Sequence, residues 1–134
     1  MSVAQAMAGK VDPKTASGPA LKAFFRIADR WKLDGEQRMT LLGAPARSTF
    51  FKWKKEQDGN LSVDTLERIS YLLGIFKALH VLLPDEDAAD AWVRKANAAP
   101  LFSGRSALDR MLSGRVGDLY VVRQYLDAQR GGWA

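Results

Sequence analysis

Apolar residues recur along almost the whole chain at the spacing of an α-helix, and this periodicity limits the fold more than any other feature of the sequence. The first such series follows Gly18-Pro19 and consists of Leu21, Phe24, Phe25, Ala28 and Trp31. Residues spaced by three and four positions share one face of a helix. Nowhere do Val, Ile and Thr alternate with polar residues over the length of a strand. The sequence therefore predicts an all-α fold.

Glycine, proline and capping residues divide this pattern into separate helices. The first is predicted to end near Lys32, and the others are predicted at about residues 36–42, 46–57, 63–73, 75–83, 87–96, 107–112 and 118–129. Pro45 is expected in the first turn of its helix, where a missing N–H loses no hydrogen bond. Ser62 is expected to cap the helix that follows it, and Gly74 to separate that helix from the next.

Positive charge is concentrated in the first part of the chain. The formal net charge of the 134 residues is +5, and residues 1–60 contain 11 Lys and Arg against 6 Asp and Glu, whereas residues 61–134 contain 9 of each. This asymmetry predicts a polyanionic partner for the N-terminal part and a protein-facing role for the C-terminal part. A surface that is basic without a nucleic-acid partner is the alternative.

The helix predicted over residues 46–57 has one basic, hydrogen-bonding face. At helical spacing this face carries Arg47, Ser48, Phe51, Lys52 and Lys55. Phe50 and Trp53 fall on the inward side. Arg47 and Ser48, near the helix start, are placed to reach base edges, the two lysines to reach phosphates, and Phe51 to touch a thymine methyl group. A solvated basic face on an ordinary helix is the alternative.

Residues 36–57 resemble a helix-turn-helix of the Xre, or lambda-repressor-like, type. Gly43-Ala44-Pro45 joins the two helices, and Thr49-Phe50-Phe51-Lys52-Trp53 is similar to a run common in the recognition helices of this type. The turn is one residue longer than in the usual motif. The resemblance implies a DNA-binding part over residues 19–60, with operator DNA as a partner.

The usual catalytic and metal-binding patterns are not found. The sequence has no cysteine, which excludes disulfides, thiolate metal sites and thiol nucleophiles. His80, the only histidine, lies in an apolar run without a second ligand at metal spacing, so we interpret it as a packed side chain. The acidic group Asp85-Glu86-Asp87 with Asp90 is explained by capping and the helix dipole at a helix start. We therefore predict no enzyme activity, cofactor or metal.

No segment has the length and composition of a membrane span. The apolar stretch over residues 71–83 is interrupted by Gly74, Lys77 and His80 and is shorter than the ~20 residues that a spanning helix needs. Residues 1–18 lack a continuous apolar segment, so we interpret them as a disordered arm and not as a signal peptide. We expect a cytoplasmic protein.

The last third of the chain contains a characteristic series of residues. Its parts are Trp92, residues 100–114 (PLFSGRSALDRMLSG), Val121-Val122 and residues 125–132 (YLDAQRGG). This series resembles the toxin-binding domain of the Xre/MbcA/ParS family of bacterial antitoxins, over roughly residues 60–134. The resemblance implies a helical toxin-binding subdomain over residues 61–134, packed against the helix-turn-helix subdomain.

The same resemblance implies the antitoxin of a type II toxin–antitoxin pair. The implied partner is a RES-domain toxin, a class that consumes NAD or transfers ADP-ribose from it, inhibited by occlusion of its nucleotide site. We expect the residues that contact the toxin to be Phe102, Arg105, Met111, Gln129, Arg130 and Trp133. Residues 127–134 follow the last core position and are expected to enter the toxin's cleft, with a frayed tail as the alternative.

A homodimer is expected on two grounds. The apolar stripe of Leu66, Ile69, Leu72, Leu73, Ile75 and Leu79 exceeds what one short helix needs for an intramolecular core. Autorepression through a two-fold operator also usually requires a dimer. The rival interpretation is a stand-alone transcription regulator whose C-terminal part only dimerises, and an isolated gene without a neighbouring toxin would favour it.

Overall fold

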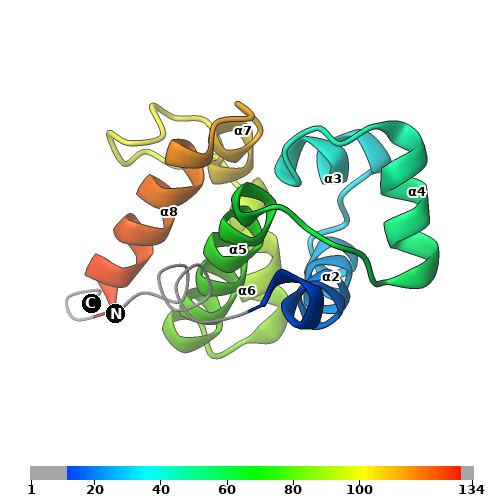
Figure 1. Ribbon diagram of the computed structural model, residues 1–134. Helices are drawn as coiled ribbons and strands as arrows, with labels where there is room; N and C mark the ends of the chain where they lie inside the picture. The colour runs from blue at the N-terminus through cyan, green and yellow to red at the C-terminus, as the bar shows by residue number, and fades with distance from the viewer. Residues whose placement is uncertain (1–11, 131–134) are drawn as a thin grey trace.

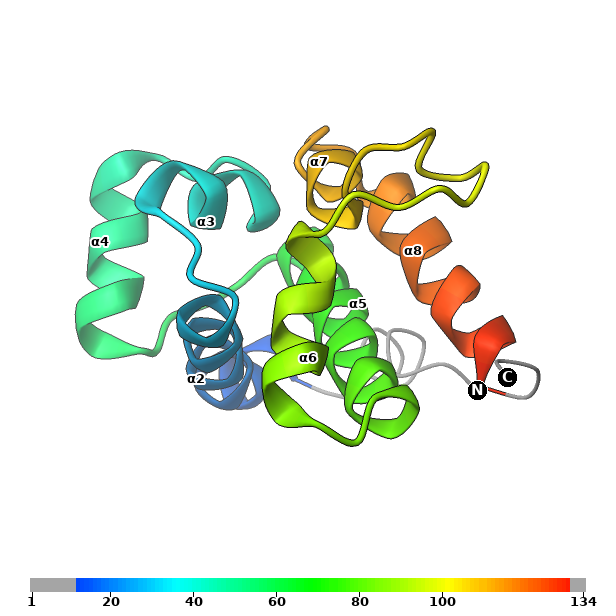
Figure 2. The ribbon, with the colours of Figure 1, turned by 180° about the vertical axis from the view of Figure 1, so that it is seen from behind.

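The computed structural model describes residues 12–130, and within this range the chain is built from helices (Figures 1 and 2). The elements are α2 (Pro13–Arg30), α3 (Gly35–Leu41), α4 (Arg47–Glu56), α5 (Val63–Leu82), α6 (Glu86–Ala91), the 3-10 turn η1 (Trp92–Arg94), α7 (Ala107–Met111) and α8 (Val116–Gln129). The described residues form no strand beyond one isolated antiparallel bridge between Ala96 and Ser106. The all-α prediction is confirmed. No described helix combines the length and apolar character needed to cross a bilayer.

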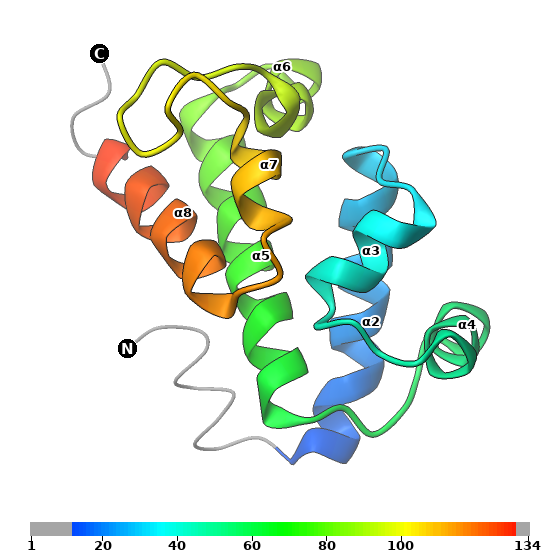
Figure 3. The same ribbon diagram turned by 90° about the horizontal axis from the view of Figure 1, so that it is seen from above.

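Helix α5 lies at the centre of the molecule, with α2 on one side and α8 on the other (Figure 3). It also packs against α6. Its fully buried residues include Ile69, Leu72, Ile75, Ala78 and Leu79. A helix that is apolar on several sides is stable only when it is enclosed. The remaining helices therefore form a shell around α5, with α3 and α4 beside α2 and with α7 beside α8 (Figures 1 and 3).

The predicted break at Gly74 is wrong, because α5 continues without interruption through this residue. Gly74 is buried, and a Cβ atom there would lie 1.8 Å from Nη1 of Arg123. The missing side chain lets the Arg123 side chain of α8 lie directly against the backbone of α5. Gly74 thus allows α5 and α8 to approach closely, and it does not end a helix.

The predicted arm over residues 1–18 is also too long, because α2 begins at Pro13. Asp12 caps this helix by accepting a hydrogen bond from the backbone N–H of Lys14 at 3.0 Å. The buried Ser17 accepts a hydrogen bond from the backbone N–H of Leu61 at 2.9 Å. This tertiary contact ties the first part of α2 to the residue before the N-cap of α5, and helical spacing does not predict it.

The close approach at Gly74 predicts a difference between two glycine substitutions. Gly117 lies in the first turn of α8 with no atom within 4 Å of an added Cβ, so Gly117→Ala should raise the free energy of unfolding by up to about 1 kcal/mol through helix propensity. Gly74→Ala should not show this gain, because Arg123 must leave α5 and its ion pair with Asp127 at 3.0 Å. Denaturant unfolding followed by circular dichroism measures both.

A double variant tests whether the clash between the added Cβ atom and Arg123 is the cause. Combined with Arg123→Ala, Gly74→Ala should recover the gain seen at Gly117, roughly 0.5–1 kcal/mol. Equal stability of Gly74→Ala and Gly117→Ala in the presence of Arg123 would contradict this account of the glycine.

Candidate interaction surfaces

Helix α4 turns an apolar side toward α2 and a polar side toward solvent. Phe50 is 1% exposed, and its ring centre lies 6.0 Å from that of Phe25 in α2. Trp53 is half-buried against the same core. The residues predicted for the outer face are all exposed: Arg47, Ser48, Phe51, Lys52 and Lys55. The predicted orientation of this helix is therefore confirmed.

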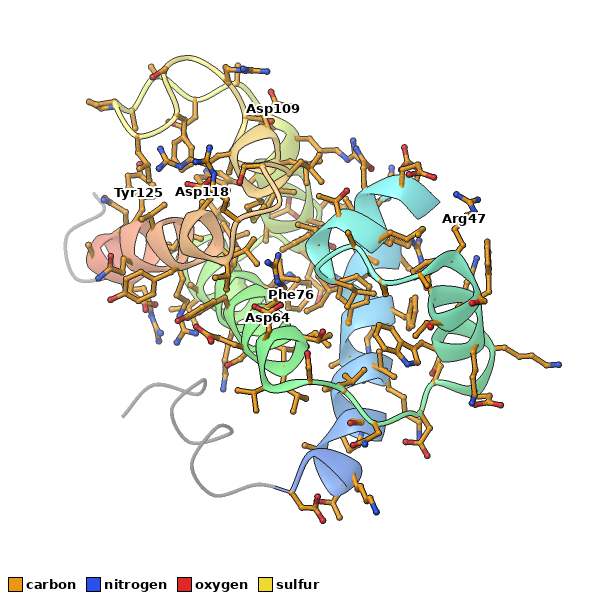
Figure 4. The ribbon with its side chains drawn as sticks, turned by 45° about the horizontal axis from the view of Figure 1, so that its top comes forward. Arg47, Asp64, Phe76, Asp109, Asp118 and Tyr125 are labelled. Atoms are coloured by element: carbon orange, nitrogen blue, oxygen red, sulfur yellow. The ribbon has the colours of Figure 1, made fainter. Side chains whose placement is uncertain are left out.

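Arg47 is held at the start of α4 by two neighbours. Its Nη1 donates to Oε1 of Glu36 in α3 at 2.9 Å, and its guanidinium carbon lies 5.8 Å from the centre of the Phe51 ring. Phe51 is itself 51% exposed. Both charged groups of the ion pair are largely exposed, so it adds little stability but orients Arg47 (Figure 4).

The turn between α3 and α4 leaves the start of α4 open. Gly43 and Ala44 have φ values of +92° and +57°, and helical conformation resumes only at Arg47. Pro45 precedes the N-cap residue Ala46, so the expectation that Pro45 lies in the first helical turn is wrong. The two left-handed residues place it outside the helix. Because Ala46 has no side-chain acceptor, the positive end of the helix dipole lies uncapped beside Arg47.

Two of the six residues expected to contact a toxin are core residues. Phe102 is 3% and Met111 1% exposed. The Phe102 ring packs edge-on against Trp92 and Tyr125, with ring centres 5.9 Å and 5.2 Å away. The structure thus places both side chains in the core and not on an exposed face, because the helical spacing that marks an apolar residue does not show on which side a partner lies. Both residues pack within the C-terminal part of the core, and Phe102 also lines a cleft there.

The other residues of that set lie at the surface or outside the described range. Arg105 has a 75% exposed side chain on the loop before α7. Gln129 is half-buried and ends α8, and Arg130 is exposed directly after it. Residues 127–129 form the last turn of α8, so a segment beyond the helix begins only at Arg130. Trp133 lies outside the described residues.

A cleft of about 400 Å³ opens between the loop at residues 101–106, α7 and the start of α8. Arg110 bridges its walls, since Nε donates to Oδ1 of Asp118 at 3.1 Å and Nη1 to the carbonyl of Leu101 at 2.8 Å. The hydrogen bond from Ser113 and the charges of Arg110 and Arg115 lower the pKa of Asp118, although its partial burial acts in the opposite direction. This network keeps Asp118 ionised and fixes the exposed loop on α8 (Figure 4).

The stripe on which a homodimer was expected is used inside the monomer. Leu66, Ile69, Leu72, Ile75 and Leu79 are at most 4% exposed, and Leu73 is half-buried. That ground for a dimer is wrong, because the fourth and fifth predicted helices are one long helix enclosed by three others.

His80 and the acidic residues near it have structural partners. Nε2 of His80 lies 2.9 Å from Oδ1 of Asp90, whose Oδ2 accepts from Nε of Arg30 at 2.7 Å. Asp85 caps α6, and Glu86 lies 3.8 Å from Arg30. The described residues contain no group of three side chains arranged to hold a metal ion. The interpretation of His80 as a packed side chain is confirmed by these contacts.

Sequence spacing missed the contacts that join the two halves of the chain. Arg30 and Asp90 are sixty residues apart, and Arg94 donates from Nε to the carbonyl of Trp31 at 2.8 Å and from Nη2 to that of Lys32. No local sequence motif predicts either the Arg30–Asp90 pair or the contacts of Arg94. The only sign in the sequence is a charged residue inside an otherwise apolar helical pattern.

Comparison with known proteins identifies both parts of the chain. Residues 10–74 match the model of the antitoxin Xre-like helix-turn-helix domain, and residues 78–132 match that of the antitoxin Xre/MbcA/ParS C-terminal toxin-binding domain. The chain is 60% identical over 112 residues to a protein of Sinorhizobium fredii (strain NBRC 101917 / NGR234) described as uncharacterized protein y4oB, with 84% of each chain covered. The two matched regions meet inside α5, whereas the sequence pattern placed the division at residue 60.

The Asp118 network predicts a pH-dependent contribution to stability. Asp118→Asn should lower the free energy of unfolding by about 1–3 kcal/mol at pH 7, because charged hydrogen bonds are lost. The folded-state pKa lies below the ordinary value of 3.8, so the contribution is complete above that value and disappears as the pH falls through the lower folded-state pKa. Urea unfolding of the wild type and of Asp118→Asn between about pH 7 and pH 3 measures their free energies of unfolding, and the difference between the two should become smaller as the pH falls.

Asp109→Asn is the matched control. Asp109 is 49% exposed on its side chain and lies 3.6 Å from Arg105, so its removal should change stability by less than about 1 kcal/mol. A difference between wild type and Asp118→Asn that stays constant down to the lowest pH would show that the charge of Asp118 is not what stabilises the cleft.

Proposed function

Because the chain belongs to the Xre/MbcA/ParS family of antitoxins, we propose that it neutralises a RES-domain toxin by occluding the toxin's active site, and that it represses its own operon. The antitoxin role follows from the family. The toxin class is suggested by the residues of the last third of the chain, which resemble antitoxins of RES toxins. The observation that carries the second activity is the exposed basic face of α4, whose side chains lie outside the core.

DNA binding is supported by what the outer face of α4 presents. Arg47 lies at the uncapped start of the helix, and Lys52 and Lys55 are exposed farther along it. A recognition helix enters the major groove with its N-terminal residues nearest the base edges. Arg47 is thus placed for bidentate contact with guanine, and the lysines for phosphates. On binding, Arg47 exchanges Glu36 for a base.

Toxin binding is supported by the position of the C-terminal end. Helix α8 is anchored by the buried residues Leu119, Val122 and Leu126, and its last turn leads to the exposed Arg130. A helix that ends at an exposed arginine, with an aromatic residue, Trp133, three positions later in the sequence, suits a pocket built for a nucleotide with two phosphates and an aromatic ring. We assign the occlusion to Arg130 and Trp133, with Gln129 and Arg105 at the edge of the contact.

A dimer remains part of the proposal, because a two-fold operator usually takes two copies. The buried stripe of α5 cannot supply its interface. The rival function, a stand-alone regulator with a C-terminal dimerisation domain, is disfavoured by the match of residues 78–132 to a toxin-binding domain.

The first experiment concerns operator binding. Lys55→Ala should weaken binding of the full-length protein equally on its own promoter and on a scrambled duplex, and lower the salt slope by about 1, because one phosphate contact is lost. Arg47→Ala should cost about 1–3 kcal/mol on the promoter alone, because base readout is lost. Gel-shift titrations at several salt concentrations measure both effects.

Lys77→Ala, an exposed lysine on α5, is the control and should change nothing. If the double variant Arg47→Ala/Lys52→Ala bound the operator as tightly as the wild type, α4 would not be the DNA-binding helix. Light scattering of the protein–DNA complex gives the copy number, and one 14.8 kDa chain per operator would contradict the dimer.

The second experiment concerns the toxin. Truncation after Gln129 leaves α8 complete and removes Arg130 and Trp133, so co-expression with the toxin should restore toxicity while thermal unfolding and operator binding stay unchanged. Buried arginine and aromatic anchors are each worth ~2 kcal/mol or more at the centre of an interface, so toxin capture should weaken at least tenfold. Growth, a pull-down and the toxin's NAD-dependent activity are the measurements.

Alanine in place of Gln129 alone serves as a milder comparison, because that side chain is half-buried. If cells that carry the truncated antitoxin grow normally and the toxin stays inhibited, occlusion comes from another surface, and the exposed loop at Arg105 is then the first to test.

A further inference from the structure

A hollow of about 470 Å³ lies where the helix-turn-helix meets the C-terminal part of the chain. Gln37 of α3 forms one side, and Arg94, Arg105, Ser106 and Asp109 contribute to the other. Hydrogen bonds from Asn97 N to Arg105 O at 3.0 Å and from Gly104 N to Asn97 O at 2.9 Å hold the loop that carries Arg105. The hollow therefore has fixed walls on both sides.

The two arginines give this hollow a positive charge. Arg94 is exposed, and its guanidinium is fixed by the carbonyl groups of Trp31 and Lys32, which do not neutralise it. Arg105 faces only Asp109, at 3.6 Å, and its side chain is 75% exposed. Two cations thus face one carboxylate, and each guanidinium retains N–H groups for an anion.

The hollow lies on the same edge of the molecule as the start of the recognition helix. In Figures 1 and 2, the first turn of α4, then α3, then α7 with its preceding loop follow one another along this edge. Figure 4, which turns the edge toward the viewer, labels Arg47 at the start of α4 and Asp109 on α7. A duplex that contacts the start of α4 and continues along this edge passes over α3 toward the hollow, which Arg94 and Arg105 line.

We propose that Arg94 and Arg105 bind a backbone phosphate of the operator beside the segment that α4 reads, so that the C-terminal part takes part in DNA binding. The site depends on the operator binding proposed above and adds a second anchor to it. A phosphate is the fitting group, because exposed arginine forks set back from the recognition helix meet the DNA backbone and not base edges. Arg94 also ties the site to the end of α2, so the contact positions both halves on the duplex.

Substitution of Arg105 should leave the fold intact, since its side chain is 75% exposed and its ion pair within the described residues, with Asp109 at 3.6 Å, lies at the surface. With full-length protein, Arg105→Ala should lower the slope of log K against log salt by about 1. The loss of affinity should be the same fold-change on the promoter duplex and on a scrambled duplex of equal length. Arg105→Lys should recover most of the slope, because it keeps the charge.

Two further variants sharpen the result. Asp109→Asn removes the carboxylate beside Arg105. It should therefore strengthen DNA binding, whereas Arg105→Ala should weaken it. Arg115→Ala is the matched control, because this side chain is 83% exposed beside Asp118 and does not line the hollow. It should leave the slope unchanged.

The outcomes separate this site from the DNA-binding proposal itself. If wild-type protein shows no salt-dependent binding, operator binding fails as a whole. If Arg47→Ala weakens promoter binding while Arg105→Ala and Asp109→Asn leave the slope unchanged, only the phosphate site is overturned. Should Arg105→Ala in that case weaken only the capture of the toxin, the arginine serves the toxin contact alone and not the DNA.

Discussion

The enclosure of α5 is the constraint on which the rest of the structure depends. This helix of 20 residues is buried from Thr65 to Leu79 at most positions that face α2, α6 and α8. Each large aliphatic side chain removed from water contributes about 1.5–3 kcal/mol, and α5 carries several that are fully buried. A single helix covers only one side of another, so α2, although it has 18 residues, cannot enclose α5 alone. The N-terminal and C-terminal helices must therefore both pack on it.

That shared core explains why the two proposed activities belong to one rigid scaffold. The recognition helix is held through α2, and the C-terminal end through α8, each packed on α5. Polar contacts reinforce the joint at one place, where Arg30 meets Asp90 and Arg94 binds the carbonyl groups at the end of α2. Both contacts are partly buried, where charged hydrogen bonds are worth more than at the surface. A partner bound at either end therefore meets a surface of fixed geometry.

Much of the α4 surface could be predicted from the sequence, and much of the toxin-facing surface could not. On α4, periodicity separates the exposed face from Phe50 and Trp53 because one helix packs on one side only. In the C-terminal part, Phe102 and Met111 carry the same apolar signal as interface residues, yet both are buried. Short helices connected by loops do not reveal from spacing which side is covered. The polar network around Asp118 was missed for the same reason.

The sequence by itself determined the helical class, the positions of most helices and the orientation of α4, because these follow from local spacing, caps and turn residues. It also carried the family, because long strings of residues in the last third are specific. Only the tertiary structure decided that α5 continues through Gly74 and that its apolar stripe is used within one chain. Arg123 of α8 lies against Gly74 and outweighs the tendency of glycine to end a helix, and α2, α6 and α8 cover the stripe. Those contacts are set by packing in three dimensions, and no local pattern encodes them.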